Sequence, residues 1–326
     1  TTIIEMVRKK LVLNACGVKS LGGVKLFVEA FELLVESDNE IIVLYSENEF
    51  YNDLKNQSLE NKYIDFIKLS NKRVIHPFYY LVTNRKQRKI IENSDAIIHF
   101  GNFGFNTKIK SFVLVQNILP FVLRDLKNTI LKYLITKSFK SSEYIIVQLE
   151  HMTEVFHKKY KDKIISIGQL VETVVETKSK SGKIVLFGSK VPNKNFNFMV
   201  KVLKQISKNN IITIINPPKN MSEFNCVYTE TQDQTMSVMS EHEIYFHASE
   251  YETVGLPIYE AQNLGLKLVI PKRPYTNYFR SENVFTYELN NPQSALVSIE
   301  EAKNFNIKNS PTLIYNENWS KILEYI

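Results

Sequence analysis

The 326-residue chain contains only two cysteines, Cys16 and Cys226, which lie far apart and belong to no Cys-x-x-Cys or Cys/His cluster. Neither a disulfide framework nor a zinc site is indicated, and a reducing compartment such as the cytoplasm is expected. No run approaches the roughly 18 uncharged apolar residues of a membrane-spanning helix. Basic residues at positions 8–10 interrupt the start, so no signal peptide is expected. We therefore expect a soluble or peripheral protein.

Several catalytic motifs are missing as well. There is no Asp-x-Asp pair and no His/Asp/Glu spacing typical of a metal site, so no metal cofactor is expected. The absence of Gly-x-Ser-x-Gly argues against an acyl hydrolase. Residues 17–25 (GVKSLGGVK) nearly match a P-loop, but no Lys-Ser/Thr pair follows Gly22, and the GxGxxG fingerprint is absent too. Gly22 and Gly23 at a helix start still allow a phosphate or sugar to approach the backbone, although a purely structural turn is an alternative.

Short apolar runs alternate with helical patterns along the whole chain. The runs that predict strands cover residues 10–16, 40–46, 95–100, 111–117, 143–149, 163–167, 183–189, 211–216, 226–230, 243–248 and 267–271. Helical periodicity fills the gaps, for instance at 23–37 and 119–138. Such alternation predicts parallel sheets with helices on both faces, and the length predicts two domains. Ligands of such sheets bind beyond the carboxyl ends of the strands, so a cleft between the domains is the expected site.

The polar segment 168–182 (GQLVETVVETKSKSG) is interpreted as a linker. We therefore predict one doubly wound domain over residues 1–167 and a second over 168–326. The terminal segment 310–326, which includes Trp319, is predicted to be a helix.

The net charge of +7 is concentrated in the first half, where residues 1–167 hold 25 Lys/Arg against 18 Asp/Glu. The basic residues form two groups, Lys72, Arg73, Arg85, Lys86, Arg88 and Lys89 in the first and Lys132, Lys137, Lys140, Lys158, Lys159, Lys161 and Lys163 in the second. With the nearby aromatic residues at 78–80, these groups are typical of a surface that binds an anionic membrane or nucleic acid. A solvated helix face is the alternative.

The segment 249–260 (SEYETVGLPIYE) is the most informative part of the sequence. Glu252 follows an apolar run that predicts a buried strand, and Gly255 and Pro257 then predict a tight turn into a helix that contains Glu260. A helix start presents backbone N–H groups and partial positive charge, which suit a phosphate. Carboxylates beside a phosphate are favourable only if they bind neutral hydroxyls, so the pair indicates a sugar nucleotide. An ordinary βα unit with exposed glutamates is the alternative.

Residues 249–275 (SEYETVGLPIYEAQNLGLKLVIPKRPY) resemble the signature of retaining glycosyltransferases of the GT-B fold, family four (glycosyl transferases group one). The resemblance implies an α/β architecture of two doubly wound Rossmann-like domains that face each other across a cleft, with the last helix crossing back to the first domain. It also implies that Glu252 contacts the transferred sugar, that the amides of Val254, Gly255 and Leu256 hold the diphosphate, and that Glu260 binds the ribose. Gly22 and Gly23 would meet the donor from the first domain.

Two positions depart from the family pattern. Where the family has an arginine and a lysine that clamp the diphosphate, this chain has Ser189, followed by Lys190, and then Lys194 at the lysine position. A lysine lacks the bidentate fork of arginine. Gln116 stands where many relatives have a histidine near the reacting sugar, so that position supplies no general base.

The remaining candidates follow two strands of the first domain. His99 and Asn102 follow one strand, and Gln116 and Asn117 follow another. His99 is the candidate titratable group near the chemistry, with a packed strand residue as the alternative. His247 either lines the donor site or packs in its strand.

Together these features predict a retaining, metal-independent glycosyltransferase, expected to be a hexosyltransferase. It would move a sugar from a nucleoside diphosphate sugar to a hydroxyl acceptor. By family analogy the acceptor is a lipid-linked saccharide of bacterial O-antigen or capsule assembly, and the enzyme is cytoplasmic and peripheral at the inner face of the cell membrane, without a nucleic acid partner. Rivals of the same fold are a sugar-nucleotide epimerase, which the glutamate pair disfavours, and a glycogen phosphorylase or synthase relative. A catalytically silent subunit that docks on membrane or nucleic acid is the rival of another class.

Overall fold

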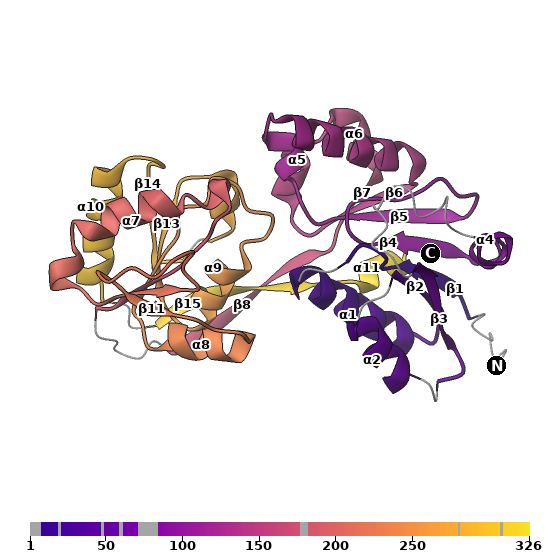
Figure 1. The fold of residues 1–326 in the computed structure, drawn as a ribbon, viewed down its shortest axis with the longest axis horizontal. Helices are drawn as coiled ribbons and strands as arrows, with labels where there is room; N and C mark the ends of the chain where they lie inside the picture. Colours follow the sequence, from indigo (N-terminus) through magenta and orange to yellow (C-terminus); the bar gives the residue numbers. More distant parts are fainter. Residues whose placement is uncertain are drawn as a thin grey trace. The chain divides into compact units, whose positions relative to one another are not determined.

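A computed structural model describes residues 8–18, 21–46, 49–58, 61–70, 84–176, 182–279, 281–306 and 309–326 of the chain. Contacts divide the chain into two units. The first consists of Thr1–Gly168 together with Glu317–Ile326, and the second is Gln169–Asn316. Figure 1 shows the helices and strands of both units.

The first unit is built from alternating strands and helices. Its strands are β1 (Lys10–Asn14), β2 (Glu40–Ser46), β3 (Ile64–Ser70), β4 (Ala96–His99), β5 (Lys110–Val115), β6 (Tyr144–Val147) and β7 (Ile164–Ser166). Its α-helices are α1 (Leu21–Glu36), α2 (Glu49–Gln57), α4 (Arg85–Glu92), α5 (Leu119–Val122), α6 (Leu126–Ser141) and α11 (Ser320–Leu323). Two 3₁₀ segments, η2 (Glu150–Val155) and η3 (Lys158–Lys163), precede β7.

All seven strands are parallel and lie in the order β3-β2-β1-β4-β5-β6-β7. The order reverses direction between β1 and β4, where Asn14 pairs in register with His99. Such a switch point leaves a crevice beyond the strand ends, which is the usual ligand site of doubly wound sheets.

Alternate residues of each strand enter cores on opposite faces of the first sheet. Leu11 and Leu13 pack with α1 on one face, whereas Val12 packs on the other. Helices α4 and α6 cover that second face, through Ile91 and Phe139 respectively. This period of two is what parallel strands require when both faces are buried.

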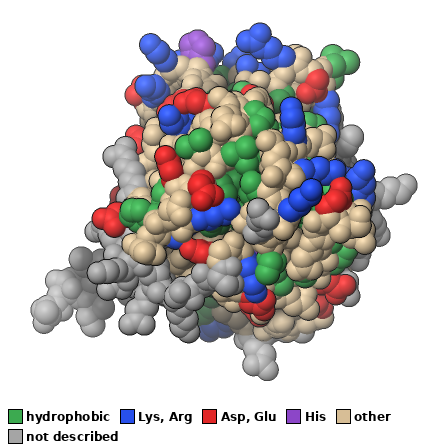
Figure 2. Space-filling view, turned by 90° about the vertical axis from the view of Figure 1, so that its left-hand side faces the viewer, with side chains coloured by type: hydrophobic (Ala, Val, Ile, Leu, Met, Phe, Trp, Pro, Cys, Tyr) green, Lys and Arg blue, Asp and Glu red, His purple; other side chains and the backbone are tan. Residues whose placement is uncertain are grey.

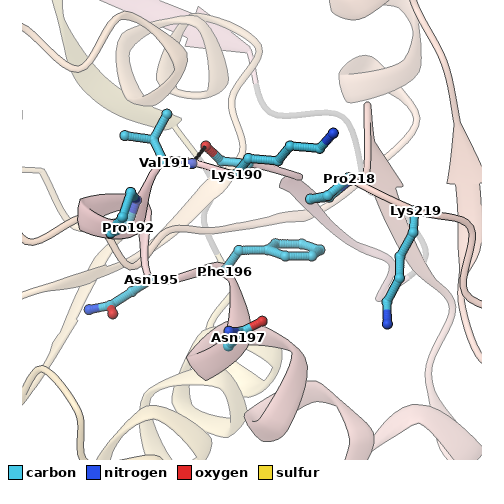
Figure 3. Close-up of a pocket in the computed structure, with 9 residues that line it drawn as sticks. Lys190, Val191, Pro192, Asn195, Phe196, Asn197, Pro218 and Lys219 are labelled. Atoms are coloured by element: carbon cyan, nitrogen blue, oxygen red, sulfur yellow. Dashed lines mark hydrogen bonds between the residues drawn. The ribbon is translucent and has the colours of Figure 1, made fainter.

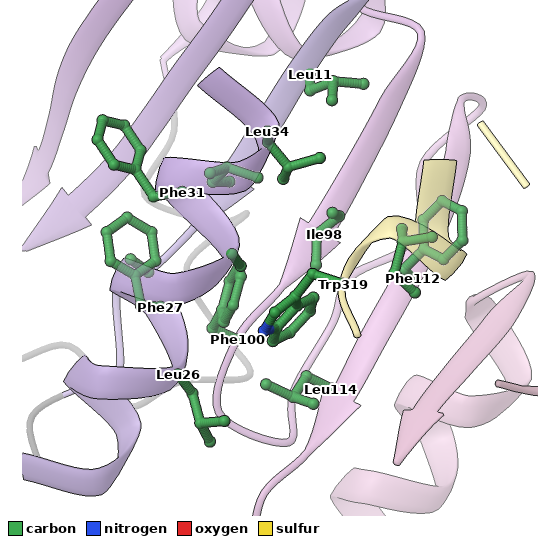
Figure 4. Close-up of a cluster of buried hydrophobic side chains, with 14 of the residues drawn as sticks. Leu11, Leu26, Phe27, Phe31, Leu34, Ile98, Phe100, Phe112, Leu114 and Trp319 are labelled. Atoms are coloured by element: carbon green, nitrogen blue, oxygen red, sulfur yellow. The ribbon is translucent and has the colours of Figure 1, made fainter. Parts of the chain in front are cut away.

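The end of the chain is anchored in the first core. Trp319 is 1% exposed and packs with Phe100, with ring centroids 5.7 Å apart. Figure 4 shows its indole beside Ile98 and Leu114 of the sheet. Trp319 is the single tryptophan of the chain, so its fluorescence reports the unfolding of the first unit.

The second unit repeats the same plan. Its strands are β8 (Gly168–Glu176), β9 (Ile184–Phe187), β10 (Ile212–Ile215), β11 (Asn225–Val227), β12 (Ile244–Phe246), β13 (Lys267–Pro271), β14 (Val284–Tyr287) and β15 (Asn309–Glu317). Its helices are α7 (Phe196–Lys204), α8 (Gln232–Ser240), α9 (Leu256–Asn263) and α10 (Pro292–Asn304), with 3₁₀ turns η4 (Pro192–Lys194), η5 (Ser207–Asn209) and η6 (Pro274–Tyr278).

The main sheet of the second unit is parallel, in the order β11-β10-β9-β12-β13-β14, and β8 pairs with β15 in a separate ribbon. Its switch point lies between β9 and β12. Helices α7 and α10 bury their apolar sides on one face of the sheet, and α8 and α9 lie on the other. On the face that Figure 2 shows, basic and acidic side chains are interspersed.

The prediction of doubly wound α/β domains is confirmed, and several details differ. The segment predicted as a linker contains β8, because its run LVETVV, which is rich in β-branched residues, pairs with β15. The terminal segment 310–326 is not one helix: β15 occupies its first part and only α11 is helical. The predicted helix over 119–138 is broken by Asp125, which caps a new helix by accepting from the Asn128 amide at 2.9 Å. Strands β3 and β14 were not predicted.

Candidate functional site

The candidate site lies at the switch point of the second sheet. The loop after β9 leads through η4 to α7, and the loop after the neighbouring strand β12 leads to α9. Both loops leave the carboxyl ends of their strands. A ligand of such a sheet binds at this edge, so the polar residues of the two loops lie where a ligand would bind.

Two hydrogen bonds, one between backbone groups and one from a side chain, hold the two loops together. The Glu250 amide donates to the Asn193 carbonyl at 2.7 Å, and the Asn193 side-chain amide donates to the Tyr251 carbonyl at 3.0 Å. As a result Lys194 faces Glu252, and its Nζ lies 2.5 Å from the Glu252 Oε1. The structure therefore brings together a lysine and a glutamate that are 58 positions apart in the sequence.

Glu252 is held as a buried carboxylate. Its side chain is 8% exposed, and its Oε1 also lies 3.0 Å from the His247 Nε2. Burial opposes ionisation, but the His247 hydrogen bond and the positive charge of Lys194 outweigh it and lower the pKa of Glu252 to about 2. Glu252 is therefore fully ionised at neutral pH and cannot act as a proton donor there.

His247 connects Glu252 to a buried tyrosine. Burial lowers the pKa of His247 more than its hydrogen bond to Glu252 raises it, so the imidazole is neutral at physiological pH. A carboxylate only accepts hydrogen bonds, so Nε2 carries the proton and donates to Glu252. The other nitrogen, Nδ1, lies 3.1 Å from the Tyr245 hydroxyl and accepts from it. The contacts from Tyr245 to His247 and from His247 to Glu252 fix the orientation of the Glu252 carboxylate.

The turn from Glu252 into α9 depends on a glycine. Gly255 has φ 79° and ψ 42°, in the left-handed region, and a Cβ there would lie 3.1 Å from the Ile258 side chain. Leu256 is the first helical residue, and Pro257 occupies the first turn, where its missing N–H is tolerated. The backbone from Val254 to Leu256 thus forms the helix start, which presents amides and partial positive charge to an anion.

Glu260 lies on α9 and is partly exposed. Its Oε1 accepts a hydrogen bond from the Gln232 side chain of α8 at 3.0 Å. Burial, followed by the charges of Glu252 and Glu260, raises the pKa of Tyr245 well above its usual value. The charges of both carboxylates therefore reach the same buried hydroxyl.

Ser189 and Lys190, which precede Lys194 in the loop after β9, line a pocket of about 470 Å³ on the second unit. Phe196 points into the space between Lys190 and Lys219, the latter from the loop after β10 (Figure 3). The loops after β9 and β10 approach each other closely because residue 188 is glycine. A Cβ at this position would lie 2.4 Å from the Pro217 Cα. Lys219 adds a positive charge to the pocket that Ser189 also lines.

The candidates after β4 and β5 come together in the first unit. The Asn102 Oδ1 accepts from the Gln116 amide at 2.6 Å and from the Asn117 amide at 3.1 Å. Asn102 has φ 75°, so its left-handed backbone turns this side chain onto the neighbouring loop. The Asn117 Oδ1 accepts from the Leu119 amide at 2.9 Å, at the start of α5. These side-chain oxygens shape the loops, and Gln116 is half-buried.

His99 is fully buried at the switch point of the first sheet. Its Nδ1 lies 2.9 Å from the Asn14 side-chain amide, and the Phe105 ring packs edge-on at 4.6 Å. Because His99 is 0% exposed, it could contact a substrate only if residues that cover it, such as Phe105, moved. Gly22 and Gly23 lie in the first turn of α1. A Cβ on Gly22 would meet nothing within 4 Å, so packing does not require glycine there.

The structure also reveals contributors that the sequence did not single out. Asn193 joins the two loops, Tyr245 holds His247, and Lys219 lines the pocket. His247 was expected either to line the donor site or to pack in its strand. In the structure it is buried beside its strand and also contacts Glu252. The signal available in the sequence was the alternation of Tyr245 and His247, which places both side chains on one face of β12 and its extension.

Of the first predicted basic group, Lys72 and Arg73 lie outside the described residues, and Arg85, Lys86, Arg88 and Lys89 lie on α4. Among the residues that are described, no group of three or more His, Cys, Asp or Glu side chains could hold a metal ion. Within the same ranges, no helix is long and apolar enough to cross a bilayer.

No family model and no curated protein matches the sequence. Solved structures do match the fold. A glycosyltransferase from Rickettsia africae has a TM-score of 0.64 at 13% identity, over 91% of this chain and 88% of its own. HepE from Anabaena, solved with UDP and glucose, has a TM-score of 0.65 at 11% identity, over 91% and 90%. WaaG, a glycosyltransferase of lipopolysaccharide biosynthesis, has a TM-score of 0.61 at 10% identity, over 90% of each chain.

These likenesses, together with the two doubly wound sheets, show that the chain has the GT-B fold. The two doubly wound domains that the 249–275 motif implied are thus found, and the likeness in fold extends over about nine-tenths of the chain.

Proposed function

We propose that the chain is a retaining glycosyltransferase that moves a sugar from a nucleoside diphosphate sugar to a hydroxyl acceptor. The observation that carries this proposal is the meeting of Lys194 and Glu252, at 2.5 Å, at the switch point of the second sheet and ahead of the start of α9. A cation, a fixed carboxylate and a helix N-terminus suit a ligand that carries both a diphosphate and a sugar. HepE, which shares the fold, was solved with UDP-glucose.

On this proposal the donor diphosphate lies against the amides of residues 254–256 and Lys194, while Glu260 accepts hydrogen bonds from the ribose hydroxyls. Lys190 and Lys219 would add charge from the adjoining pocket, which offsets the serine at position 189. Lys194 is paired with Glu252, so the diphosphate would share this cation with the carboxylate. The side chain of Lys194 is 34% exposed, which leaves part of it accessible to a phosphate.

Departure of the diphosphate leaves positive charge at the anomeric carbon. Glu252 is suited to stabilise that charge, because its pKa of about 2 keeps it anionic at neutral pH and its hydrogen bond to His247 orients it in advance. Retention would follow from attack on the same face, as in the resembling family. We propose that no metal takes part, since Lys194 and the helix start supply positive charge to the diphosphate.

For the acceptor we propose a lipid-linked saccharide, such as one of bacterial surface polysaccharide assembly, with the enzyme peripheral at the inner face of the cell membrane. The basic first half of the chain supports this location, and WaaG, of similar fold, takes part in lipopolysaccharide biosynthesis. A hexose is the proposed transferred sugar.

Turnover of radiolabelled sugar nucleotides in the presence of bacterial lipid extract tests the proposal. Transfer of label to lipid is expected for the parent chain. The Glu252→Gln variant should lose turnover, whereas the control Glu250→Gln should keep it. Glu250 is a neighbour whose side chain is 40% exposed and lies 3.6 Å from Arg273. If the parent binds nucleotide sugars but turns none over, the silent-subunit alternative is favoured.

A further inference from the structure

Helix α6 carries an exposed apolar stripe on the surface of the first unit. Leu126 is 78% exposed, Ile130 is 52% exposed and Tyr133 is 69% exposed. These residues are spaced four and three positions apart, so they lie on one face of the helix. The opposite side of α6 is anchored in the core through Ile135 and Phe139, both of which are buried. The stripe therefore points outward and has no partner among the described residues.

Basic residues surround this stripe. The exposed basic side chains of the segment are Arg124, Lys127, Lys132, Lys137 and Lys140. No acidic residue occurs from 126 to 142, and the one at 125 is engaged in capping the helix. At a spacing of 3.6 residues per turn, Lys137 and Lys140 continue the line of the apolar residues, while Lys127 and Lys132 flank it. The outward face of α6 is thus apolar along its first half and basic along its second half, and lysines flank the apolar part.

We propose that this face of α6 docks on an anionic lipid membrane. This proposal rests on the peripheral location proposed above, and it identifies the surface that would contact the membrane. The apolar residues Leu126, Ile130 and Tyr133 would enter the boundary between headgroups and acyl chains, and the lysines would remain at the anionic headgroups. This pairing of apolar and basic residues is the chemistry of helices that lie in a membrane interface.

Charge complementarity favours a membrane over other partners. A second copy of the chain would bring like charges together across the stripe. Nucleic acid would use the lysines but would leave Leu126 and Ile130 exposed to water. Helix α4 holds a basic group without an exposed large apolar residue, so it can add attraction but not insertion. We therefore assign membrane docking to α6 and a supporting charge to α4.

Sedimentation with vesicles tests the assignment on the full chain. The apolar variant carries Leu126→Gln, Ile130→Gln and Tyr133→Gln, which keep helix propensity and net charge. A control for the loss of exposed apolar side chains carries Ile211→Gln and Tyr228→Gln, at residues of the second unit that are 57% and 62% exposed. The vesicles contain phosphatidylglycerol mixed with phosphatidylcholine, or phosphatidylcholine alone.

The parent and the control should bind the anionic vesicles, and the apolar variant should bind more than about tenfold more weakly. A basic variant, with Lys127→Gln, Lys137→Gln and Lys140→Gln, should lose about fivefold per residue at low salt and approach the parent at high salt. Hydrolysis of a donor sugar nucleotide, measured without lipid, should be equal in all four proteins. That readout separates failure of this proposal from failure of the proposed activity.

Equal vesicle binding by the parent and the apolar variant would overturn the assignment to α6. Equal binding of the parent to phosphatidylcholine alone, tighter binding to duplex DNA than to anionic vesicles, or self-association that the apolar variant abolishes would overturn the choice of partner. Absence of vesicle binding by the parent would refute the peripheral location itself.

Discussion

The buried carboxylate of Glu252 should make the second unit sensitive to acid. The pKa of Glu252 is about 2 in the folded chain, against an ordinary value of 4.5. Because the folded pKa is the lower one, the carboxylate stabilises the fold above pH 4.5, and this contribution is lost as the pH falls toward 2. The full difference corresponds to about 3 kcal/mol, of which about 2 kcal/mol should be lost between pH 6 and pH 3.

Glu252→Gln removes this titration while keeping the size of the side chain and an oxygen that accepts from His247. Lys194 loses its partner but is 34% exposed, so water can solvate it. The variant should therefore lose about 2 kcal/mol less of its unfolding free energy than the parent between pH 6 and pH 3. All other titrating groups are shared and cancel in the comparison.

Urea unfolding at both pH values measures the difference. Far-UV circular dichroism follows both units, whereas fluorescence follows the first unit, where Trp319 is buried. The fluorescence transition should be the same in parent and variant, and the transition seen only by circular dichroism should differ. Parallel pH dependence of that second transition would show that Glu252 is not held as a low-pKa carboxylate.

Three further predictions concern the nucleotide, the metal and the chain terminus. Glu260→Ala should weaken nucleoside diphosphate binding by about 1–3 kcal/mol in calorimetry, because ribose hydroxyls lose their acceptor; the control Gln232→Ala should change it less, and unchanged affinity in the glutamate variant would refute the ribose contact. EDTA should leave sugar transfer intact, and loss of activity that Mg²⁺ or Mn²⁺ restores would contradict metal independence. Trp319→Ala should destabilise the first unit by about 3–5 kcal/mol in urea unfolding, without changing nucleotide affinity; full stability would mean that the terminal segment is not part of that core.

The α/β class of the fold was accessible from the sequence because strands buried on both faces are continuous apolar runs. The runs at 40–46 and 267–271 match β2 and β13 residue for residue. The same rule missed β3, where polar residues such as Asp65 and Lys68 interrupt the pattern at the edge of the sheet. It also missed β8, since a two-stranded ribbon carries no continuous apolar run and its pairing with β15 is made across more than a hundred residues.

Local motifs indicated the parts of the candidate site but not their contacts. The turn at Gly255 and the positions of Glu252 and Glu260 follow from neighbouring residues. The ion pair between Lys194 and Glu252 does not, because it depends on how two separate loops are joined through Asn193. The low pKa of Glu252 likewise arises from burial, His247 and Lys194 together, and none of these is visible in the motif itself.

The proposed donor, a nucleoside diphosphate sugar, would bind at the ends of β9 and β12. Amide hydrogen exchange of the full chain, with and without UDP, GDP, ADP and dTDP and their glucose derivatives, locates this binding site, because a ligand stabilises the segments that it contacts. We predict that at least one of these nucleotides slows exchange in residues 188–195 and 249–260, and that Glu260→Ala reduces the effect. Exchange that no nucleotide changes, or protection confined to the first unit, would show that the donor does not bind at these strand ends.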